Sequence, residues 1–242
     1  QEFLKLPQEV LVTVMRHHQK YFSVIDDRDE IQPYFLTVVN TQGDPDGKIS
    51  QGHEKVLKAR LEDAAFFWKT DRKEALKERV EQLKQVVFQE KLGSYHAKTV
   101  RIRKLCAELE NEEHLDTAAL LCKGDLTTDM VRELPELQGI MGGLYAQDEG
   151  YPEEVCRAIG EHYKPVSLED ESPATRFGAL LSVADKLDTI VGCFSIGIVP
   201  TGSSDPFALR RHAQGLIKIL FDLKLNWSLR WLVEKAQKNF PE

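Results

Sequence analysis

Residues 118–129 read AALLCKGDLTTD, and this stretch decides how the second half of the chain is to be understood. The apolar run is expected to end a helix near Leu121, and Cys122, Lys123 and Asp125 follow it directly. Such a stretch is either the rim of a metal site or the polar end of a buried helix. The choice determines whether this part of the chain carries out chemistry.

Two further residues belong to the metal hypothesis. His96 lies in the expected helix YHAKTVRIRKLCAEL, and Asp185 lies in the distant phrase LSVADKLD. This outline resembles the HD phosphohydrolase superfamily, in which a His on one helix, a His-Asp pair ending a later helix and a distant Asp surround divalent metals. Where that superfamily has the His-Asp pair, this chain has Cys122 and Lys123.

This replacement favours a polar helix end. A charged lysine cannot ligate a metal and would repel it, which leaves too few ligands. Asp125 and Asp129 lie one turn apart and are alternative ligands, but Asp125 is better explained as the cap of the helix LTTDMVREL and Asp129 as part of its solvated face. We therefore expect an HD-like scaffold with no metal and no catalytic residue. Its degenerate HD positions are His96, Cys122, Lys123 and Asp185.

The composition is that of an ordinary water-soluble globular protein. The 242 residues are 42% hydrophobic and 29% charged, and they contain no run of 18 apolar residues, so we expect a cytoplasmic protein with no membrane contact. The four cysteines are widely spaced without a CxxC pair, which favours reduced, buried thiols. The chain opens on QEFLKLPQEV without a methionine, which suggests a piece of a longer protein.

The pattern of apolar residues predicts an α+β fold that is mainly α. Three short β-branched and aromatic runs, EVLVTVM, YFSVID and PYFLTVVN, are expected strands, and helical periodicity takes over near residue 53. We expect residues 1–92 to form part of a mixed α/β body domain, with strands to about residue 50 and then two helices. Residues 93–225 would form an all-helical HD-like domain, and 226–242 the start of a following helical or linker segment.

Charge is distributed unevenly along the chain. The net charge is −7, yet residues 53–104 carry 14 Lys and Arg against 8 Asp and Glu, whereas residues 105–172 carry 4 against 17. A basic band beside an acidic domain allows local contact with RNA although the whole protein is acidic.

Three stretches support such contact. RHHQKYF mixes cations with aromatic rings, EKVLKARLEDAAFF carries cations along one helix, and DPFALRR places two arginines in the first turns of a helix whose N-terminus also favours phosphate. In that last helix Asp205 is the expected N-cap and Pro206 the first residue. A solvated charged face would look the same as each stretch. The candidate RNA contacts are Lys20, Lys55, Lys58, Arg60, Lys98, Arg101, Arg210 and Arg211. His17 and His18 lie in a strand context, where one of them would point inward.

The order of several longer phrases is more specific than any single one. They are LPQEVLVTVMRHHQKYF, GHEKVLKARLEDAAFFWKTD, FQEKLGSYHAKTVRI, GDLTTDMVRELPELQGIMGGLYA, EHYKP and ADKLDTIVGCFSIGIVPTGSSDPFALRR. Together they resemble the β subunit of bacterial-type glycyl-tRNA synthetase, from about Leu6 to Leu220. Lys123-Gly124-Asp125-Leu126 keeps a form common in that family, whereas His53 stands where Asn is common.

The resemblance implies a part of a glycine–tRNA ligase, an α2β2 heterotetramer in which the α subunit uses ATP, Mg and glycine for adenylation. The β subunit would bind tRNA-Gly, and this segment would be a non-catalytic scaffold for RNA contact and assembly without a cofactor of its own. A metal-dependent HD phosphohydrolase is the alternative, which a bound metal or nucleotide turnover would establish. A purely structural spacer is a second alternative.

Overall fold

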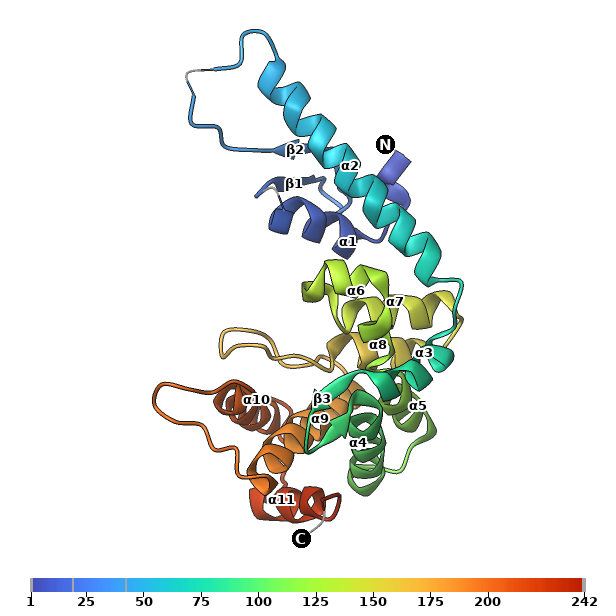
Figure 1. Cartoon of the computed structure of the whole chain (residues 1–242), viewed down its shortest axis with the longest axis vertical. Coiled ribbons are helices and arrows are strands. Elements are labelled where there is room, and N and C mark those ends of the chain that lie inside the picture. The colour runs from blue at the N-terminus through green and yellow to red at the C-terminus, as the bar shows by residue number, and fades with distance from the viewer. Residues whose placement is uncertain (1, 19, 42, 241–242) are drawn as a thin grey trace. The chain divides into compact units, whose positions relative to one another are not determined.

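The computed structural model describes residues 2–18, 20–41 and 43–240 (Figure 1). The chain folds into two compact units: an N-terminal unit of residues 1–74 with 128–138, and a helical unit of residues 75–127 with 139–242. Helices dominate, and β structure in the described residues consists of two small two-stranded sheets. The predicted α+β, mainly α class is therefore confirmed.

The N-terminal unit combines helices with one β-hairpin. Its elements are η1 (Glu2–Lys5), α1 (Gln8–Thr13), η2 (Val14–His18), β1 (Phe22–Ile25), β2 (Ile31–Leu36), α2 (Lys48–Asp71), α6 (Asp129–Glu133) and η5 (Pro135–Leu137). Strand β1 pairs antiparallel with β2, with Phe22 opposite Leu36 and Ile25 opposite Ile31. The strands expected in YFSVID and PYFLTVVN thus exist, with shifted ends.

The strand expected in EVLVTVM is wrong, because this stretch is helical in α1 and η2. Its buried residues are Val10, Leu11, Val14 and Met15. The spacing of one, three and one positions follows a helix face, whereas a strand would bury alternate residues. The valines favoured β structure, but the packing of this stretch against the rest of its unit favours a helix. His17 is 40% exposed and lies 3.0 Å from Glu136, and the side chain of His18 lies outside the described part of the structure.

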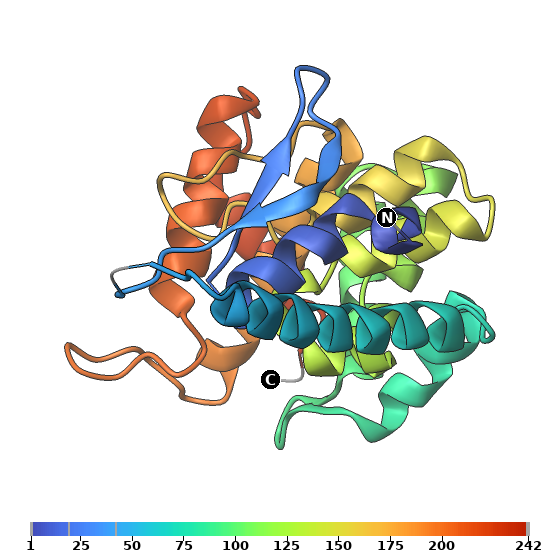
Figure 2. The same cartoon turned by 90° about the horizontal axis from the view of Figure 1, so that it is seen from above.

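Helix α2 is the longest element of the N-terminal unit and is seen lengthwise in Figure 2. Its first turn is capped by Asp44, whose carboxylate accepts the N–H groups of Ile49 (3.0 Å) and Ser50 (2.8 Å). At its other end the buried Asp71 carboxylate accepts the N–H groups of Asp129 and Met130, both at 3.0 Å. These two bonds explain why residues 128–138 belong to the same compact unit as α2.

The helical unit is built around α9. Its elements are α3 (Leu76–Gln82), η3 (Leu83–Gln85), β3 (Val87–Gln89), β4 (Gly93–Ser94), α4 (Tyr95–Leu109), α5 (Glu113–Leu121), η4 (Gly124–Thr127), α7 (Ile140–Asp148), α8 (Glu153–Glu161), α9 (Arg176–Ser195), α10 (Leu209–Asp222) and α11 (Leu229–Gln237). Helix α9 packs against α4, α5, α8, α10 and α11, and most of its residues are buried. Ser94 caps α4 by accepting the N–H of Ala97.

The glycines of GIMGG permit a close approach of α7 to α8. A Cβ on Gly142 would lie 2.8 Å from Cγ2 of Ile159, and one on Gly143 would lie 2.7 Å from the carbonyl oxygen of Cys156. These distances are too short for a Cβ atom, so a side chain would force Ile159 to move at position 142 and the backbone of α8 to move at position 143. The motif is therefore explained by helix packing. The four cysteines are buried and unbridged, as predicted.

The compact units differ from the expected domain boundaries at residues 92 and 225. Leu76, Val80 and Leu83 are buried within the helical unit, so residues 75–92 pack there. Residues 226–242 belong to the same unit, because α11 packs against α9. Apolar periodicity marks helices but does not show which neighbour covers their buried faces.

Candidate functional site

Asp185 in α9 is the centre of a buried ion network in the helical unit. The Nζ atom of Lys123 lies 2.7 Å from Oδ2 of Asp185, and the Nζ atom of Lys98 lies 2.9 Å from Oδ1. None of these three side chains is more than 5% exposed. A single carboxylate is thus held between two ammonium groups in a region without solvent.

Lys123 has two further neighbours from the EHYKP stretch. Its Nζ atom lies 2.8 Å from Nε2 of His162 and 3.8 Å from the ring centre of Tyr163. Nδ1 of His162 lies 2.6 Å from the carbonyl oxygen of Ile159, so Nδ1–H donates there and Nε2 accepts from the ammonium. Burial, with the Lys123 charge, holds the pKa of His162 well below its ordinary value, so the ring is neutral.

Lys98 extends the network toward the next turn of α9. Its Nζ atom lies 3.1 Å from Oδ2 of Asp188 and donates to Oγ1 of Thr189 at 2.7 Å. Asp188 also accepts from Nε of Arg101 at 2.6 Å. Two carboxylates are therefore matched by three cations, all held by direct contacts.

The electrostatics of Asp185 follow from this geometry. Burial raises the pKa of its carboxyl group, but the ammonium groups of Lys123 and Lys98 lower it by more, so the pKa lies well below its ordinary value. Asp185 is therefore ionised at neutral pH.

These residues do not fit a divalent metal. The Asp185 oxygens that would ligate one already face lysine ammonium groups, which would repel a further cation. Across residues 2–18, 20–41 and 43–240, no three His, Cys, Asp or Glu side chains form a group that could hold a metal. Lys98 in α4 and Lys123 directly after α5 both contact the Asp185 carboxylate in α9. These contacts stabilise the packing of the three helices.

The structure places two of the expected degenerate HD positions elsewhere than at Asp185. His96 lies two residues before Lys98, about 200° around α4, and its Nε2 is 3.9 Å from Glu81. Cys122 is buried with its thiol donating to the carbonyl of Ala119, and burial raises its pKa to about 12. Lys123 and Asp185 are direct neighbours, whereas His96 is not part of the network.

Lys98 and His162 are the network members that the sequence pattern does not indicate. The pattern assigns Lys98 to RNA contact and gives His162 no role beyond its place in the phrase EHYKP. The helical phase of α4, in which Lys98, Ile102 and Leu105 share a buried face, is the signal that points Lys98 inward.

Asp125 has a different role from the expected cap. Its Oδ2 accepts the N–H groups of Gly139 (2.5 Å) and Gly142 (3.1 Å), which fixes the turn into α7. Burial raises the pKa of Asp125 to about 6. Helix α6 is capped by Thr128, whose hydroxyl accepts the N–H of Val131. Asp129 is partly exposed beside Arg132, as expected for a solvated face.

Two candidate RNA contacts are excluded by burial. Lys98 and Arg101 form ion pairs with Asp185 and Asp188, and their side chains are only 3% and 11% exposed. The sequence counted them with the basic band, but they are core ion pairs. Lys20, Lys55 and Lys58 are exposed.

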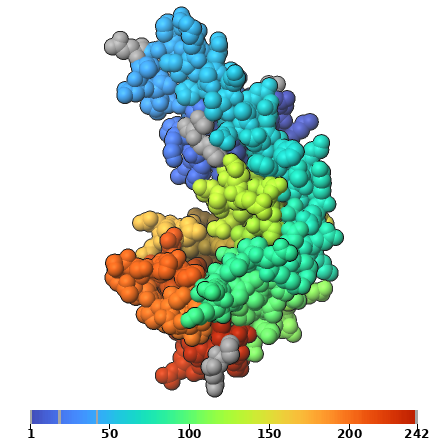
Figure 3. All heavy atoms as spheres, in the orientation of Figure 1, coloured from blue at the N-terminus to red at the C-terminus, as the bar shows by residue number. Residues whose placement is uncertain are grey.

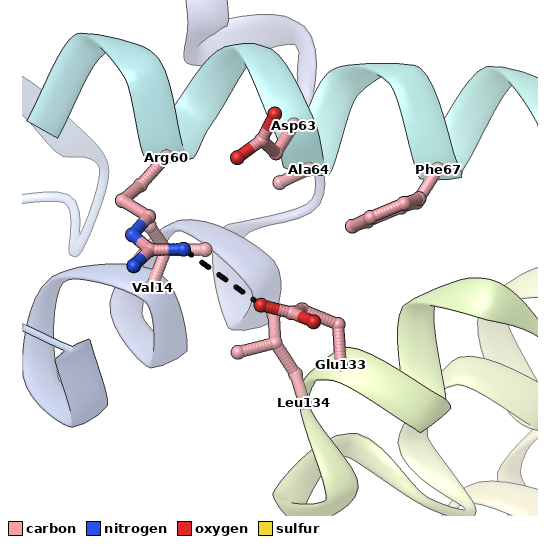
Figure 4. A pocket seen from close by; sticks show the side chains of 7 residues that line it. All are labelled: Val14, Arg60, Asp63, Ala64, Phe67, Glu133 and Leu134. Atoms are coloured by element: carbon pink, nitrogen blue, oxygen red, sulfur yellow. Dashed lines mark ion pairs between the residues drawn. The ribbon is translucent and has the colours of Figure 1, made fainter.

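Arg60 is directed into a small hollow of the N-terminal unit (Figure 4). Its Nη1 lies 3.8 Å from Oε1 of Glu133, and the surrounding side chains include Val14, Asp63 and Phe67. Arg60 is about 140° around α2 from Lys55, so the two cations do not share a face. The expected row of Lys55, Lys58 and Arg60 is therefore broken at Arg60.

The N-terminus of α10 is already occupied by an internal anion. The helix begins at Leu209 and not at Pro206, because Ala208 has a left-handed φ of 50°. The Asp205 carboxylate accepts the N–H groups of Leu209 (2.7 Å) and Arg210 (3.0 Å). Those amide groups are thus not available to a phosphate.

The two arginines of this helix differ. Nη2 of Arg210 donates to the carbonyl oxygen of Thr201 at 2.7 Å, which ties its side chain to the preceding loop. Arg211 is exposed. Of the pair, Arg211 is therefore the better placed for contact with another molecule.

Comparison with known proteins covers the whole chain. The family model described as glycyl-tRNA synthetase beta subunit matches residues 1–242. The glycine–tRNA ligase beta subunit of Geobacter metallireducens is 50% identical over 241 residues, 97% of this chain and 35% of the relative. That of Desulfitobacterium hafniense is 47% identical over 248 residues, 99% of this chain and 36% of the relative. The chain spans about a third of the length of these relatives.

Proposed function

The chain belongs to the glycyl-tRNA synthetase beta subunit family, and on that premise we propose that it works as part of the β subunit of a cytoplasmic glycine–tRNA ligase. In this proposal it contacts tRNA-Gly and supports assembly with an α subunit, which carries ATP, Mg and glycine and performs adenylation. The whole ligase is an α2β2 heterotetramer. Among the described residues, none of the helices combines the length and the apolar character that a membrane span requires.

The observation that carries this proposal is the likeness to the beta subunits, which reaches about half of all positions and runs through both compact units. A shared fold alone would not identify a function. Here the family model matches the chain from end to end, so the likeness is not limited to one apolar core.

The ion network supports a scaffold role for the helical unit. Lys123, Lys98 and Asp185 are mutually paired and shielded from solvent, so no substrate phosphate can reach them without unfolding of the core. A degenerate HD-like centre would thus serve stability in this unit and leave chemistry to the α subunit.

Glycylation assays test the proposal. Mixtures of the α subunit with and without this chain's subunit should form glycyl-adenylate at similar rates, measured by glycine-dependent exchange of pyrophosphate into ATP. Charging of tRNA-Gly should require both subunits. Equal charging by the α subunit alone would contradict the proposal.

A nucleotide turnover assay addresses the phosphohydrolase alternative. Nucleoside di- and triphosphates are incubated with the protein in Mg²⁺ or Mn²⁺, and the D185A variant is compared with the D129A control, whose carboxylate is partly exposed. Turnover that is lost in D185A and kept in D129A would favour the phosphohydrolase. Our proposal expects no turnover that depends on Asp185.

A further inference from the structure

Helix α2 carries its lysines on one face. At about 100° per residue, Lys48, Lys58 and Lys69 lie within about 60° of the direction of Lys55. Lys73 continues the row in the turn that follows the helix, and all these side chains are exposed. We call this set, Lys48, Lys55, Lys58, Lys69 and Lys73, the lysine stripe.

Nearby carboxylates compensate the charge of the lysine stripe only in part. Two of its five lysines have a carboxylate partner: Lys48 lies 2.9 Å from Asp46, just before the helix, and Lys58 lies 3.7 Å from Glu62. Among the described residues no carboxylate forms an ion pair with Lys55, Lys69 or Lys73. Lys69 in the last turn of α2 and Lys73 just after the helix add two cations at this end. The excess of cations therefore indicates a negatively charged partner.

An aromatic side chain lies within the stripe. Phe66 is 63% exposed and about 20° around the helix from Lys55. A large exposed ring among lysines suits stacking on a base or packing on a ribose, and it does not suit a purely solvated face.

The opposite face holds the stripe in place. Leu57, Leu61 and Ala64 are buried against the rest of the N-terminal unit, and Asp71 binds the backbone of α6. In the space-filling view α2, in cyan and turquoise, runs along the surface of its unit (Figure 3). From Lys48 to Lys69 the axial length is about 32 Å at 1.5 Å per residue, which spans several phosphate groups of a nucleic acid.

We propose that the lysine stripe of α2, with Phe66, is a docking face for the sugar-phosphate backbone of a structured RNA. The inference rests on the proposed function, because tRNA-Gly is the RNA that the ligase would meet. Arg60 is not part of this face, since it is paired with Glu133 on another side of the helix. Contact with phosphates would be electrostatic and would not read base sequence.

The test uses the intact ligase and a titration with labelled tRNA-Gly at several salt concentrations. The triple variant K55Q/K69Q/K73Q keeps the aliphatic stems and removes three charges. Its affinity should fall at least about tenfold near 0.1 M salt, and the slope of log K against log salt should flatten by roughly 2–3. The matched control K77Q/K91Q/K104Q removes three exposed lysines of the helical unit and should change neither. F66A should weaken binding by a few fold without a change in slope.

The outcomes separate the inference from the proposed function. If the wild-type ligase binds tRNA with salt dependence and the triple variant binds equally well, the stripe is not the docking face. If the wild-type ligase does not bind tRNA-Gly, the proposed function itself fails. If the triple variant loses its partner subunit while its own tRNA affinity is unchanged, the face binds an acidic protein surface, which also overturns the inference.

Lysine acylation footprinting gives a direct readout on unmodified protein. Lys55 and Lys69 should react in the free ligase and be protected by tRNA-Gly, while Lys91 should react in both states. Lack of reaction at Lys55 and Lys69 in the free ligase would mean that another part of the protein covers the stripe, and would contradict the inference.

Discussion

Lys98 in α4 and Lys55 in α2 belong to the same basic band of the sequence, yet the structure uses them in opposite ways. Lys98 is buried and shares its charge among Asp185, Asp188 and Thr189. Lys55 is exposed on the side of α2 that faces away from its core. The net charge of a segment therefore does not predict how much charge lies at the surface. The position of each lysine around its helix does predict it.

The difference has an energetic side. A buried carboxylate that loses its cation keeps the full cost of desolvation, so the folded state is destabilised. An exposed lysine is solvated in the folded and in the unfolded state, so its removal changes stability little. The helical unit should thus respond to loss of its lysines by unfolding, and the N-terminal unit by weaker binding. The following substitutions test this contrast.

The largest effect is expected for K123M. Methionine fills much of the lysine volume but leaves Oδ2 of Asp185 without its ammonium partner, so the free energy of unfolding should fall by about 3–5 kcal/mol. Urea unfolding followed by circular dichroism measures the change. The control K104M, at an exposed position of α4, should stay within about 0.5 kcal/mol.

A second substitution shows whether the loss is that of an unpaired charge. K123M/D185L removes both partners and should be less destabilised than K123M alone. If the double variant is the less stable one, the loss of Asp185 beside Lys98, or the loss of packing, outweighs the removal of the unpaired charge.

A smaller effect is expected from the apolar core around the network. Leu181 in α9 is fully buried, so L181A should cost roughly 2–5 kcal/mol. Leu120 in α5 belongs to the same apolar run as Leu121 but is only partly buried, so L120A should cost less than L181A. Equal losses at the two positions in urea unfolding would show that burial does not rank them.

The pH dependence of stability tests the neutral state of His162. Its folded pKa lies well below the ordinary value, because of burial first and the Lys123 charge second. The unfolded state therefore binds more protons as pH falls below about 6.5, and this contribution to stability, complete above that pH, is lost at up to about 1.4 kcal/mol per pH unit. Unfolding curves from pH 7.5 to 5 should show a shallower dependence in H162Q. An identical slope would mean that His162 binds protons equally in the folded and unfolded states, so that its pKa is not lowered by folding.

The helices of the second half were predictable because their local signals agree with their tertiary packing. Residues 95–109 were expected as one helix, and α4 has those bounds with Ser94 as its cap. The first strand failed because three valines favoured β structure while the burial pattern was helical. No local rule reveals a burial pattern that depends on distant partners.

The ion network was predictable only in part. The likeness to the HD arrangement predicted that Lys123 stands beside Asp185 in place of a metal ligand, and the two side chains are in contact. The convergence of His162 and Lys98 on these residues joins positions far apart in the chain, which single-sequence patterns do not encode. The role of Asp125 was missed for the same reason. The N–H groups that its carboxylate accepts belong to Gly139 and Gly142 at the start of α7, and helix α6 lies between them and Asp125 in the chain.

The smallest effects are expected at the start of α10. One of two neighbouring arginines there forms an internal hydrogen bond, and the other is exposed to solvent. Arg210 donates to the carbonyl of Thr201, so R210A should lower the free energy of unfolding by about 0.5–1 kcal/mol, measured in urea. Arg211 is exposed, so R211A should change stability by less than about 0.5 kcal/mol.

In a salt titration with tRNA-Gly, R211A should flatten the slope of log K against log salt by at most about 0.9, the value for one phosphate contact. Because the Asp205 carboxylate already occupies the helix N-terminus, any phosphate there depends on the Arg211 side chain alone. A larger effect of R210A than of R211A on tRNA affinity, at equal stability, would reverse this assignment.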